Sequence, residues 1–320
     1  MRRLALAAAI AMIAVGPKVA LCNDYPDHVV KIIVPITAGG PLDSVARAIA
    51  QTLSERLKQP FIVENRPGAG GNLGIQSAIA AEPDGYTLVV ATGSMLTTNP
   101  WLYKNRPFDP ELDLRPIATL TVSSQTLAVN ASLPVNSLSD LTNYSRKNPL
   151  QYATSGYGTP SDLTMQYLRM LAHFPGTPVT YRGLAPLMLD LLSGQVKVAF
   201  VATAGALPHV RKGELRALAV SSGHRSELMP DVPTIAELGF PEFIVDSYIF
   251  LMAPSHVPDS VADLLEKEVR RAVQLPEFKA YFRAEDIASV GSTSAESKAW
   301  IATELRRWGK IIKAANIQVN

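Results

Sequence analysis

The sequence is poor in cysteine, in charge of one sign and in long apolar runs, and each shortage excludes a class of protein. Cys22 is the single cysteine among 320 residues, so no intramolecular disulfide can form. Lys and Arg number 30 against 28 Asp and Glu, and the charges are mixed along the chain, which argues against nucleic-acid binding. After the N-terminus no apolar stretch approaches the roughly 20 residues that cross a bilayer. We therefore expect a mature protein without a transmembrane segment, held together by its hydrophobic core.

Patterns for catalysis and metal binding are also missing. The chain has no Gly-x-Ser-x-Gly elbow and no His-Glu-x-x-His pair. Its histidines stand singly, without a second metal ligand at helical spacing. They are His28, His173, His209, His224 and His256. We predict no catalytic residues, no metal site and no cofactor, so we expect a protein that is not an enzyme. A hydrolase with an unrecognised site is the remote alternative.

The N-terminus has the pattern of a signal peptide. Two arginines precede an apolar run over residues 4–15 that is too short to span a bilayer. We expect residues 1–22 to be cleaved off and the protein to be exported. In the less favoured alternative, Cys22 is the lipid-modified residue of a lipoprotein, but Leu21 is bulky where a small residue is wanted.

From residue 29 on, short β-branched runs alternate with longer amphipathic segments. The first part of the chain predicts strands over residues 29–34, 61–64 and 87–91, and helices over 42–57 and 75–81. The middle repeats this plan, with strands over 126–129, 151–153, 179–181, 196–201 and 215–220, and helices over 162–172 and 184–192. Such alternation is typical of βαβ units in parallel sheets, so we expect an α/β fold with two sheets flanked by helices.

The last part of the chain predicts a strand without a sheet of its own. An apolar strand is expected over residues 247–253, with amphipathic helices over 260–272 and 295–315. If these elements return to the first sheet, the chain crosses twice between two lobes, with a cleft and a hinge between them. We expect a discontinuous lobe one and an inserted lobe two. Their predicted bounds are residues 23–124 plus 246–320 for lobe one and 125–245 for lobe two.

Two loops between a strand and a helix have the composition of an anion site. In the first, the candidate residues are Thr37, Ala38, Gly39, Gly40 and Asp43. In the second, they are Ser155, Gly158, Thr159, Pro160 and Ser161. Glycines let backbone amides approach a ligand closely, and the N-terminus of a helix favours a negative group. One such helix start from each lobe would hold a carboxylate. The alternative role of Asp43 is to complement the helix dipole, and that of Ser161 is to cap its helix.

A third glycine-rich stretch, residues 64–74, superficially resembles a dinucleotide-binding fingerprint. That fingerprint follows the first strand of a βαβ unit and has an acidic residue about 20 positions further on. Here the run follows the second predicted strand. We therefore expect a tight loop between the lobes and no nucleotide cofactor.

Ordered motifs along the chain resemble the Bug-type solute receptors of tripartite tricarboxylate transporters, and the match runs from about Tyr25 to the C-terminus. The motifs are Ala38-Gly39-Gly40 with Asp43 and Ala46-Arg47, residues 64–71, 83–88, Tyr181-Arg182-Gly183, Leu207-Pro208-His209, 213–219 and 230–234. The resemblance implies a two-lobed, type II-like periplasmic binding protein. It implies that the two loops grip a ligand carboxylate, often through ordered waters.

The resemblance also implies the biological setting. The protein is expected in the periplasm as a monomer that delivers a small carboxylate-containing solute to the membrane permease subunits of a tripartite tricarboxylate transporter. A sensor that signals to a kinase is the alternative. The cleft wall is expected to contain Ser94, Tyr181, Gly183 and Thr203, which follow strands. Many relatives carry His at the position of Asp162 and Trp near Tyr248. Since a carboxylate facing the cleft would repel an anion, we expect Asp162 to point away, to cap its helix or to meet a ligand cation.

Overall fold

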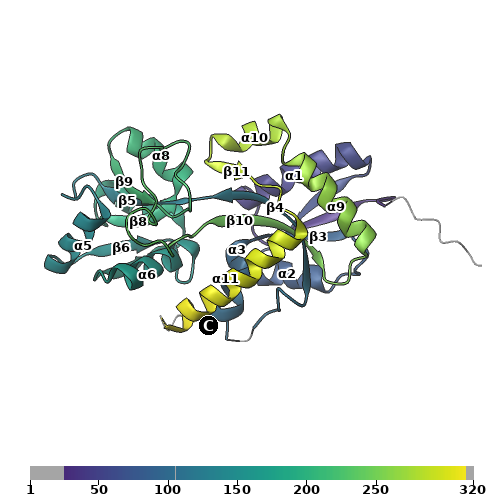
Figure 1. Ribbon diagram of the computed structural model, residues 1–320, viewed down its shortest axis with the longest axis horizontal. Coiled ribbons are helices and arrows are strands. Elements are labelled where there is room, and N and C mark those ends of the chain that lie inside the picture. Colours follow the sequence, from purple (N-terminus) through teal and green to yellow (C-terminus); the bar gives the residue numbers. More distant parts are fainter. Residues whose placement is uncertain (1–24, 105, 315–320) are drawn as a thin grey trace, which may run out of the picture.

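The computed structural model describes residues 25–104 and 106–314 and folds them on two separate sheets (Figure 1). The predicted signal peptide and Cys22 lie outside the described residues. The first sheet contains β1 (Val30–Val34), β2 (Phe61–Asn65), β3 (Thr87–Thr92), β4 (Leu114–Ser123), β10 (Ser247–Pro254) and β11 (Ile287–Ser289). The second contains β5 (Gln125–Asn130), β6 (Gln151–Thr154), β7 (Thr177–Thr180), β8 (Val198–Ala202) and β9 (Leu215–Val220). We refer to each sheet with its helices as lobe one and lobe two.

The two sheets share one strand order. In lobe one the strands run β2-β1-β3-β10-β4, followed by β11, and in lobe two they run β7-β6-β8-β5-β9. The first three strands of each row are parallel, and the fourth is antiparallel to both its neighbours. The inner strands are almost continuously buried, as expected where helices cover both faces of a sheet, whereas the edge strands β2 and β7 are largely accessible. The predicted two-sheet α/β fold is confirmed, and so is the return of the strand near residue 247 to the first sheet.

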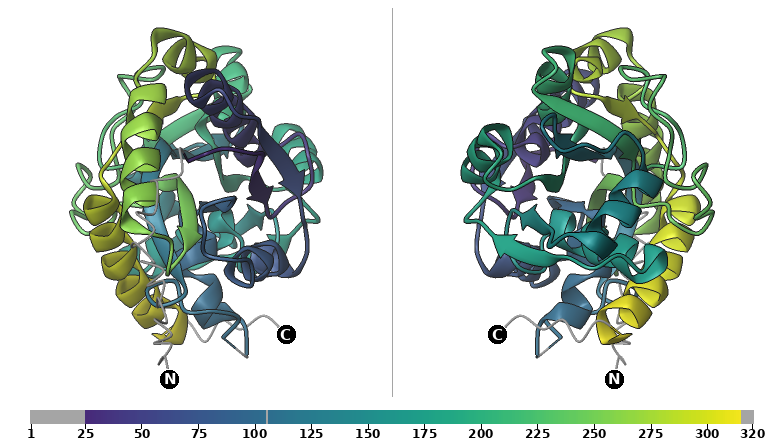
Figure 2. Two further views of the ribbon diagram at one scale, coloured as in Figure 1. Left: turned by 90° about the vertical axis from the view of Figure 1, so that its right-hand side faces the viewer. Right: turned by 90° about the vertical axis from the view of Figure 1, so that its left-hand side faces the viewer.

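Helices cover both lobes. Lobe one carries α1 (Pro41–Leu57), α2 (Asn72–Ile79), α3 (Gly93–Thr97), α4 (Asn99–Leu102), α9 (Asp259–Ala272), α10 (Pro276–Arg283) and α11 (Ser294–Ala314), with a short 3-10 turn, η1 (Ala69–Gly71). Lobe two carries α5 (Leu138–Lys147), α6 (Pro160–Ala172), α7 (Leu184–Ser193) and α8 (Thr203–Arg211). In the side views α9 and α11 run along one side of the molecule (Figure 2).

The chain passes between the sheets along two neighbouring strands. β4 leads through Ser124 into β5, and β10 begins at Ser247, which pairs with Ser123 of β4 (Figure 1). Ser221 ties the two passages together. Its Oγ donates to the carbonyl of Val245 at 2.7 Å and accepts from the N–H of Gln125 at 3.0 Å. The lobe bounds expected from the sequence stay a prediction.

Helix α11 contacts both lobes. Ile301 near its middle belongs to the core of lobe one, whereas Trp308, Ile311 and Ile312 join a core made largely from lobe two. The Trp308 ring meets that of Tyr167 on α6 edge to face, with centroids 6.0 Å apart. The helix therefore runs along the boundary between the lobes, as its diagonal path in Figure 1 shows.

The longest strand is one that the sequence pattern does not predict. β4 contains Pro116, and a proline inside an apolar run argues against a central strand because it cannot donate to the ladder. The structure places it beside a register shift in β4: Leu251 of β10 pairs with Ala118 and Met252 with Pro116, so Ile117 is the extra residue. Two helices of lobe two, α5 and α8, are also absent from the sequence-based expectation.

Candidate ligand-binding site

A cavity of about 290 Å³ lies between the lobes, and we refer to it as the cleft cavity. Both main helices begin at its wall. Pro41 and Leu42 of α1 line it from lobe one, and Pro160 and Leu163 of α6 line it from lobe two. Small-molecule sites typically enclose roughly 300–1,000 Å³, so a cavity of this size fits a small solute.

The two helices start with the same turn. Gly39 and Gly158 each have a positive φ, 96° and 70°, which favours glycine. An extended N-cap residue follows, then a proline at the first helical position, where its fixed φ suits the helix and no N–H is lost. Two residues later comes an aspartate. Asp43 accepts the Gly39 N–H at 3.0 Å, and Asp162 accepts the Gly158 N–H at 2.9 Å.

This turn holds each helix start rigid and leaves backbone donors available there. The bond to the Gly40 carbonyl from the N–H of Ser44 is the first bond along α1, and the corresponding bond in α6 comes from Leu163. The two N–H groups before each of these donors have no acceptor inside their helix. Such groups, together with the helix dipole, are what an anion requires.

The aspartates differ in charge environment. Asp43 accepts two bonds from Arg47, at 2.9 and 3.1 Å, and one from Asn65 at 2.8 Å. The Arg47 guanidinium is the main cause that lowers the pKa of Asp43 to about 2. At the place of Arg47, α6 has Gln166, which donates to Asp162 at 3.0 Å. Burial raises the pKa of Asp162, and the bonds from the Gly158 N–H and from Gln166 offset this only in part.

Neither aspartate faces the cleft cavity. The Asp43 side chain is 5% exposed and Asp162 is 2% exposed, and neither lines the cavity. Of the three roles expected for Asp162, the structure shows a carboxylate that points into the protein and binds the turn of its own helix.

Hydroxyl groups in the second loop bind one another. The Thr159 hydroxyl donates to the Gly156 carbonyl at 2.7 Å. The hydroxyls of Ser155 and Ser161 lie 2.9 Å apart, and the Ser155 N–H donates to Ser161 Oγ at 3.1 Å. Because the single hydroxyl proton of Thr159 is already used, this side chain stiffens the loop and offers a ligand no donor.

The structure brings only part of the predicted residue set to the cavity. Ser94 and Pro160 line it directly. The other loop and helix-start residues do not line the cavity itself; they are Thr37, Ala38, Gly39, Gly40, Ser155, Gly158, Thr159 and, in the first turn of α6, Ser161.

Three predicted cleft-wall residues lie elsewhere. The Tyr181 hydroxyl donates to Asp190 at 2.7 Å, and Gly183 caps α7. Thr203 is 1% exposed, and its hydroxyl lies 2.7 Å from that of Ser124. Position after a strand therefore does not by itself bring a residue to the cavity.

The glycine-rich stretch at residues 64–74 packs against other parts of lobe one, and its expected place between the lobes stays a prediction. It joins β2 to α2, which both belong to lobe one. A Cβ at Gly74 would lie 2.7 Å from Pro35 and from the carbonyl of Arg66. The glycines therefore permit close packing inside lobe one.

Much of the cavity wall comes from residues that the sequence pattern does not indicate. Asp246 and Tyr248, near the start of β10, line the cavity together with Trp300 and Trp308 of α11. The rings of Tyr248 and Trp300 meet edge to face, with centroids 4.6 Å apart. A Cβ at Gly93 would lie 2.7 Å from the Trp300 ring, so the glycine makes room for it. The spacing of the two tryptophans, eight positions along one helix, is a signal that could have placed them on one face.

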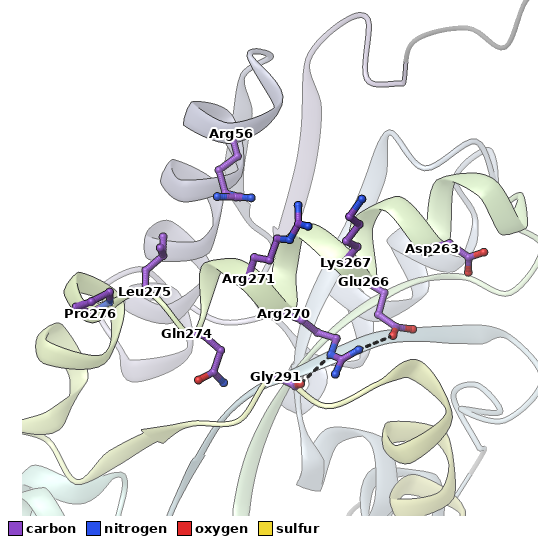
Figure 3. Close-up of a pocket in the computed structure, with 10 residues that line it drawn as sticks. All are labelled: Arg56, Asp263, Glu266, Lys267, Arg270, Arg271, Gln274, Leu275, Pro276 and Gly291. Atoms are coloured by element: carbon purple, nitrogen blue, oxygen red, sulfur yellow. Dashed lines mark hydrogen bonds and ion pairs between the residues drawn. The ribbon is translucent and has the colours of Figure 1, made fainter.

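The larger hollow in Figure 3, of about 860 Å³, lies on lobe one and shares no lining residue with the cleft cavity. Its arginines are paired. Arg270 lies 3.5 Å from Glu266 and donates to the Gly291 carbonyl at 3.1 Å, and Arg56 lies 2.6 Å from Glu268. Because these charges are compensated and only one lobe contributes, the cleft cavity is the better candidate site.

Two α/β lobes with a small cavity between them define the class of two-lobed solute-binding proteins. The model of the tripartite tricarboxylate transporter family receptor matches residues 45–317. Protein BugT of Bordetella pertussis is 32% identical over 294 residues, which cover 91% of this chain and 90% of BugT. The chain belongs to the tripartite tricarboxylate transporter receptor family, and it is a solute receptor, as the sequence motifs predicted.

Solved structures agree with this assignment. MatC from Rhodopseudomonas palustris with bound malate has a TM-score of 0.75 at 29% identity and covers 90% of this chain and 100% of its own. R. palustris Rpa4515 with adipate has a TM-score of 0.79 at 31% identity, with 92% and 99% covered. The family is periplasmic, and its members are solute-binding receptors.

Two further findings concern the described part of the chain. None of the helices within residues 25–104 and 106–314 is both long and apolar enough to cross a membrane. Over the same residues, no three His, Cys, Asp or Glu side chains come together as potential metal ligands.

Proposed function

We propose that this receptor captures a small carboxylate-bearing solute in the cleft cavity and delivers it, without chemical change, to the permease subunits of its transporter. The observation that carries the proposal is the repeated turn. Two helix starts of one geometry, one from each lobe, reach the same cavity. The names of MatC with malate and Rpa4515 with adipate support a carboxylate as the ligand class.

The residues that line the cavity explain why we assign binding of the carboxylate to the two helix starts. The lining of the cavity contains no Lys, Arg or His among the described residues. A carboxylate there is therefore held by backbone N–H groups and helix dipoles. Lobe closure over the solute brings both sets of donors to one anion, which couples binding to a shape that a permease can recognise.

The setting completes the proposal. We infer that the working form is an exported, monomeric periplasmic protein that has lost residues 1–22. Intact-mass analysis of periplasmic protein tests the processing, since a chain beginning at Cys22 with an attached lipid would contradict it. Sedimentation of the same sample tests the monomer.

Calorimetry on the first acid found in a thermal-shift screen tests the carboxylate site. Gly40 has an ordinary φ of −92°, and a Cβ there would lie 3.4 Å from Ile36 Cδ1. The backbone therefore accepts valine in Gly40→Val, but the larger side chain should hinder a ligand that approaches the start of α1. We expect tenfold to hundredfold weaker binding, since lost hydrogen bonds to a charged group are worth about 1.5–3 kcal/mol.

Gly223→Val is the matched control. Its nearest neighbour would be an isoleucine methyl at 3.5 Å, and Gly223 does not line the cleft cavity. Its affinity should stay at the wild-type value. Unchanged affinity in Gly40→Val, or equal affinity for the acid and its amide, would show that the ligand carboxylate does not bind at the two helix starts.

A further inference from the structure

The wall of the cleft cavity includes one carboxylate whose bonding capacity is hardly used. Asp246 lies just before β10 and is half-buried at the cavity. Among the described residues, the single hydrogen bond to its carboxylate comes from the Tyr248 hydroxyl at 3.3 Å. That distance exceeds the usual 2.5–3.0 Å for O–H···O bonds, and a carboxylate has about four acceptor positions. Most of its acceptor capacity is therefore open to a ligand.

Aromatic rings line the same cavity as this carboxylate. Tyr248 and Trp300 form an edge-to-face pair at 4.6 Å, and Trp308 lines the same cavity. Aromatic faces attract cations, most strongly when water is excluded. A carboxylate beside tyrosine and tryptophan rings is therefore a suitable environment for an ammonium group.

The neighbouring charges do not neutralise Asp246 directly. His224 and Arg307 favour its charged form from a distance, but neither donates a hydrogen bond to it. The Arg307 guanidinium instead lies 2.5 Å from Glu304, on its own helix. Burial raises the pKa of Asp246 to about 6, which leaves the group largely ionised at neutral pH. Within residues 25–104 and 106–314, no cation therefore bonds directly to this carboxylate.

These facts discriminate among carboxylate solutes. The second carboxylate of a dicarboxylate would be repelled if it lay near Asp246. A neutral alkyl end would leave Asp246 without a strong partner. A protonated amine would gain a charge-assisted bond to Asp246 and contacts with the rings.

We propose that the solute is a zwitterion, whose carboxylate lies at the helix starts and whose ammonium group lies between Asp246 and the rings of Tyr248 and Trp300. This inference rests on the proposed carboxylate site and adds a second charge to the solute. It separates this receptor from the relatives named with malate and adipate.

Calorimetry on the mature wild-type protein provides the first test. The probes are α- and ω-amino acids from glycine to 6-aminohexanoate and their N-trimethyl derivatives, with monocarboxylates and dicarboxylates of matched length. We expect at least one amino acid to bind tenfold or more tightly than both its matched monoacid and its matched diacid. A diacid that binds more tightly than every amino acid would overturn the proposal, whether or not any variant folds.

Asp246→Asn provides the second test. It should weaken binding of the amino acid tenfold to a hundredfold and strengthen binding of the matched diacid severalfold, because the repulsion is removed. The control is Asp263→Asn, which changes an aspartate whose side chain is 76% exposed on α9 and should alter neither affinity. Equal amino-acid affinity in Asp246→Asn and the wild type would also overturn the proposal.

The two proposals can fail separately. If no carboxylate binds, or if Gly40→Val leaves the affinity unchanged, the proposed carboxylate site is wrong. If carboxylates bind and respond to Gly40→Val, but diacids surpass amino acids, the carboxylate site stands and the zwitterion inference alone is wrong.

Discussion

Lobe one and lobe two start their main helices with the same turn but place it in different electrostatic surroundings. In lobe one, Arg47 neutralises the aspartate of the turn. In lobe two, the neutral Gln166 occupies the corresponding position, and no cation within the described part of the chain bonds directly to the buried Asp162. The comparison shows that the turn geometry depends on glycine, proline and a side-chain acceptor, whereas the charge near the anion is set independently. We infer that lobe one attracts an anion more strongly.

The largest contrast is expected from removing the charge of each aspartate. Asp43→Asn should lower the free energy of unfolding by about 1.5–3 kcal/mol, because an NH2 group replaces one of the two buried oxygens that accept the bonds from Gly39 and Asn65. Asp162→Asn should cost much less, since burial already opposes its charge. Urea unfolding at pH 7 measures both. Equal losses would show that the surroundings of the two turns do not differ in energy.

The glycines provide a test in which the two lobes should agree. Gly39→Ala and Gly158→Ala each force a side chain into the left-handed region, at a cost of about 1–2 kcal/mol. A Cβ at Gly39 would have no neighbour within 4 Å, so its cost is conformational rather than steric. Thermal unfolding with calorimetry gives the comparison. A loss at one glycine only would mean that the two turns are not equivalent.

As the pH falls, the contributions of the two aspartates to stability should change in opposite directions. The pKa of Asp43 is lowered to about 2, so its stabilisation is present above about pH 4 and is lost as the pH falls towards 2. The pKa of Asp162 is raised by burial, so wild-type stability should increase relative to Asp162→Asn as the pH falls from 7 through the folded pKa. Each pKa unit corresponds to about 1.4 kcal/mol. Parallel stability curves for wild type and Asp162→Asn would contradict the raised pKa.

The smallest effect is expected from exchanging the neighbours of the aspartates. Gln166→Arg should give Asp162 a cation and strengthen carboxylate binding, and Arg47→Gln should weaken it. Arg47 is 53% exposed, so its ion pair is worth about 0.2–1 kcal/mol, up to roughly fivefold in affinity. Calorimetry at two salt concentrations checks that the change in affinity is electrostatic, because an electrostatic effect should become smaller as the salt concentration increases.

Local signals in the sequence located the two turns but not the cavity. Gly39 and Asp43 lie within five positions, as do Gly158 and Asp162, so neighbouring residues alone indicate both turns. The wall formed by Asp246 and the tryptophans arises only when α11 and β10 pack together, and no local pattern records that contact.

The same limit explains why other features of the structure differ from the local sequence pattern. Pro116 argues against a strand at β4, and the register shift beside it is seen only in the pairing with β10. The glycines at residues 64–74 predict a close approach of another segment, but glycine alone does not identify that segment. Tyr181 and Thr203 follow strands, yet bonds to Asp190 and Ser124 direct them elsewhere.

Helix α11 sets a fixed length along one side of the site. Trp300 and Trp308 both line the cavity, and eight residues of α-helix span about 12 Å. Hinge rotation changes the distance between opposing lobes, but it does not change a distance within one helix. The length of the aromatic side of the cavity therefore stays the same when the lobes open and close. We therefore expect the affinity of a solute to depend on its length along this side, in addition to its charge.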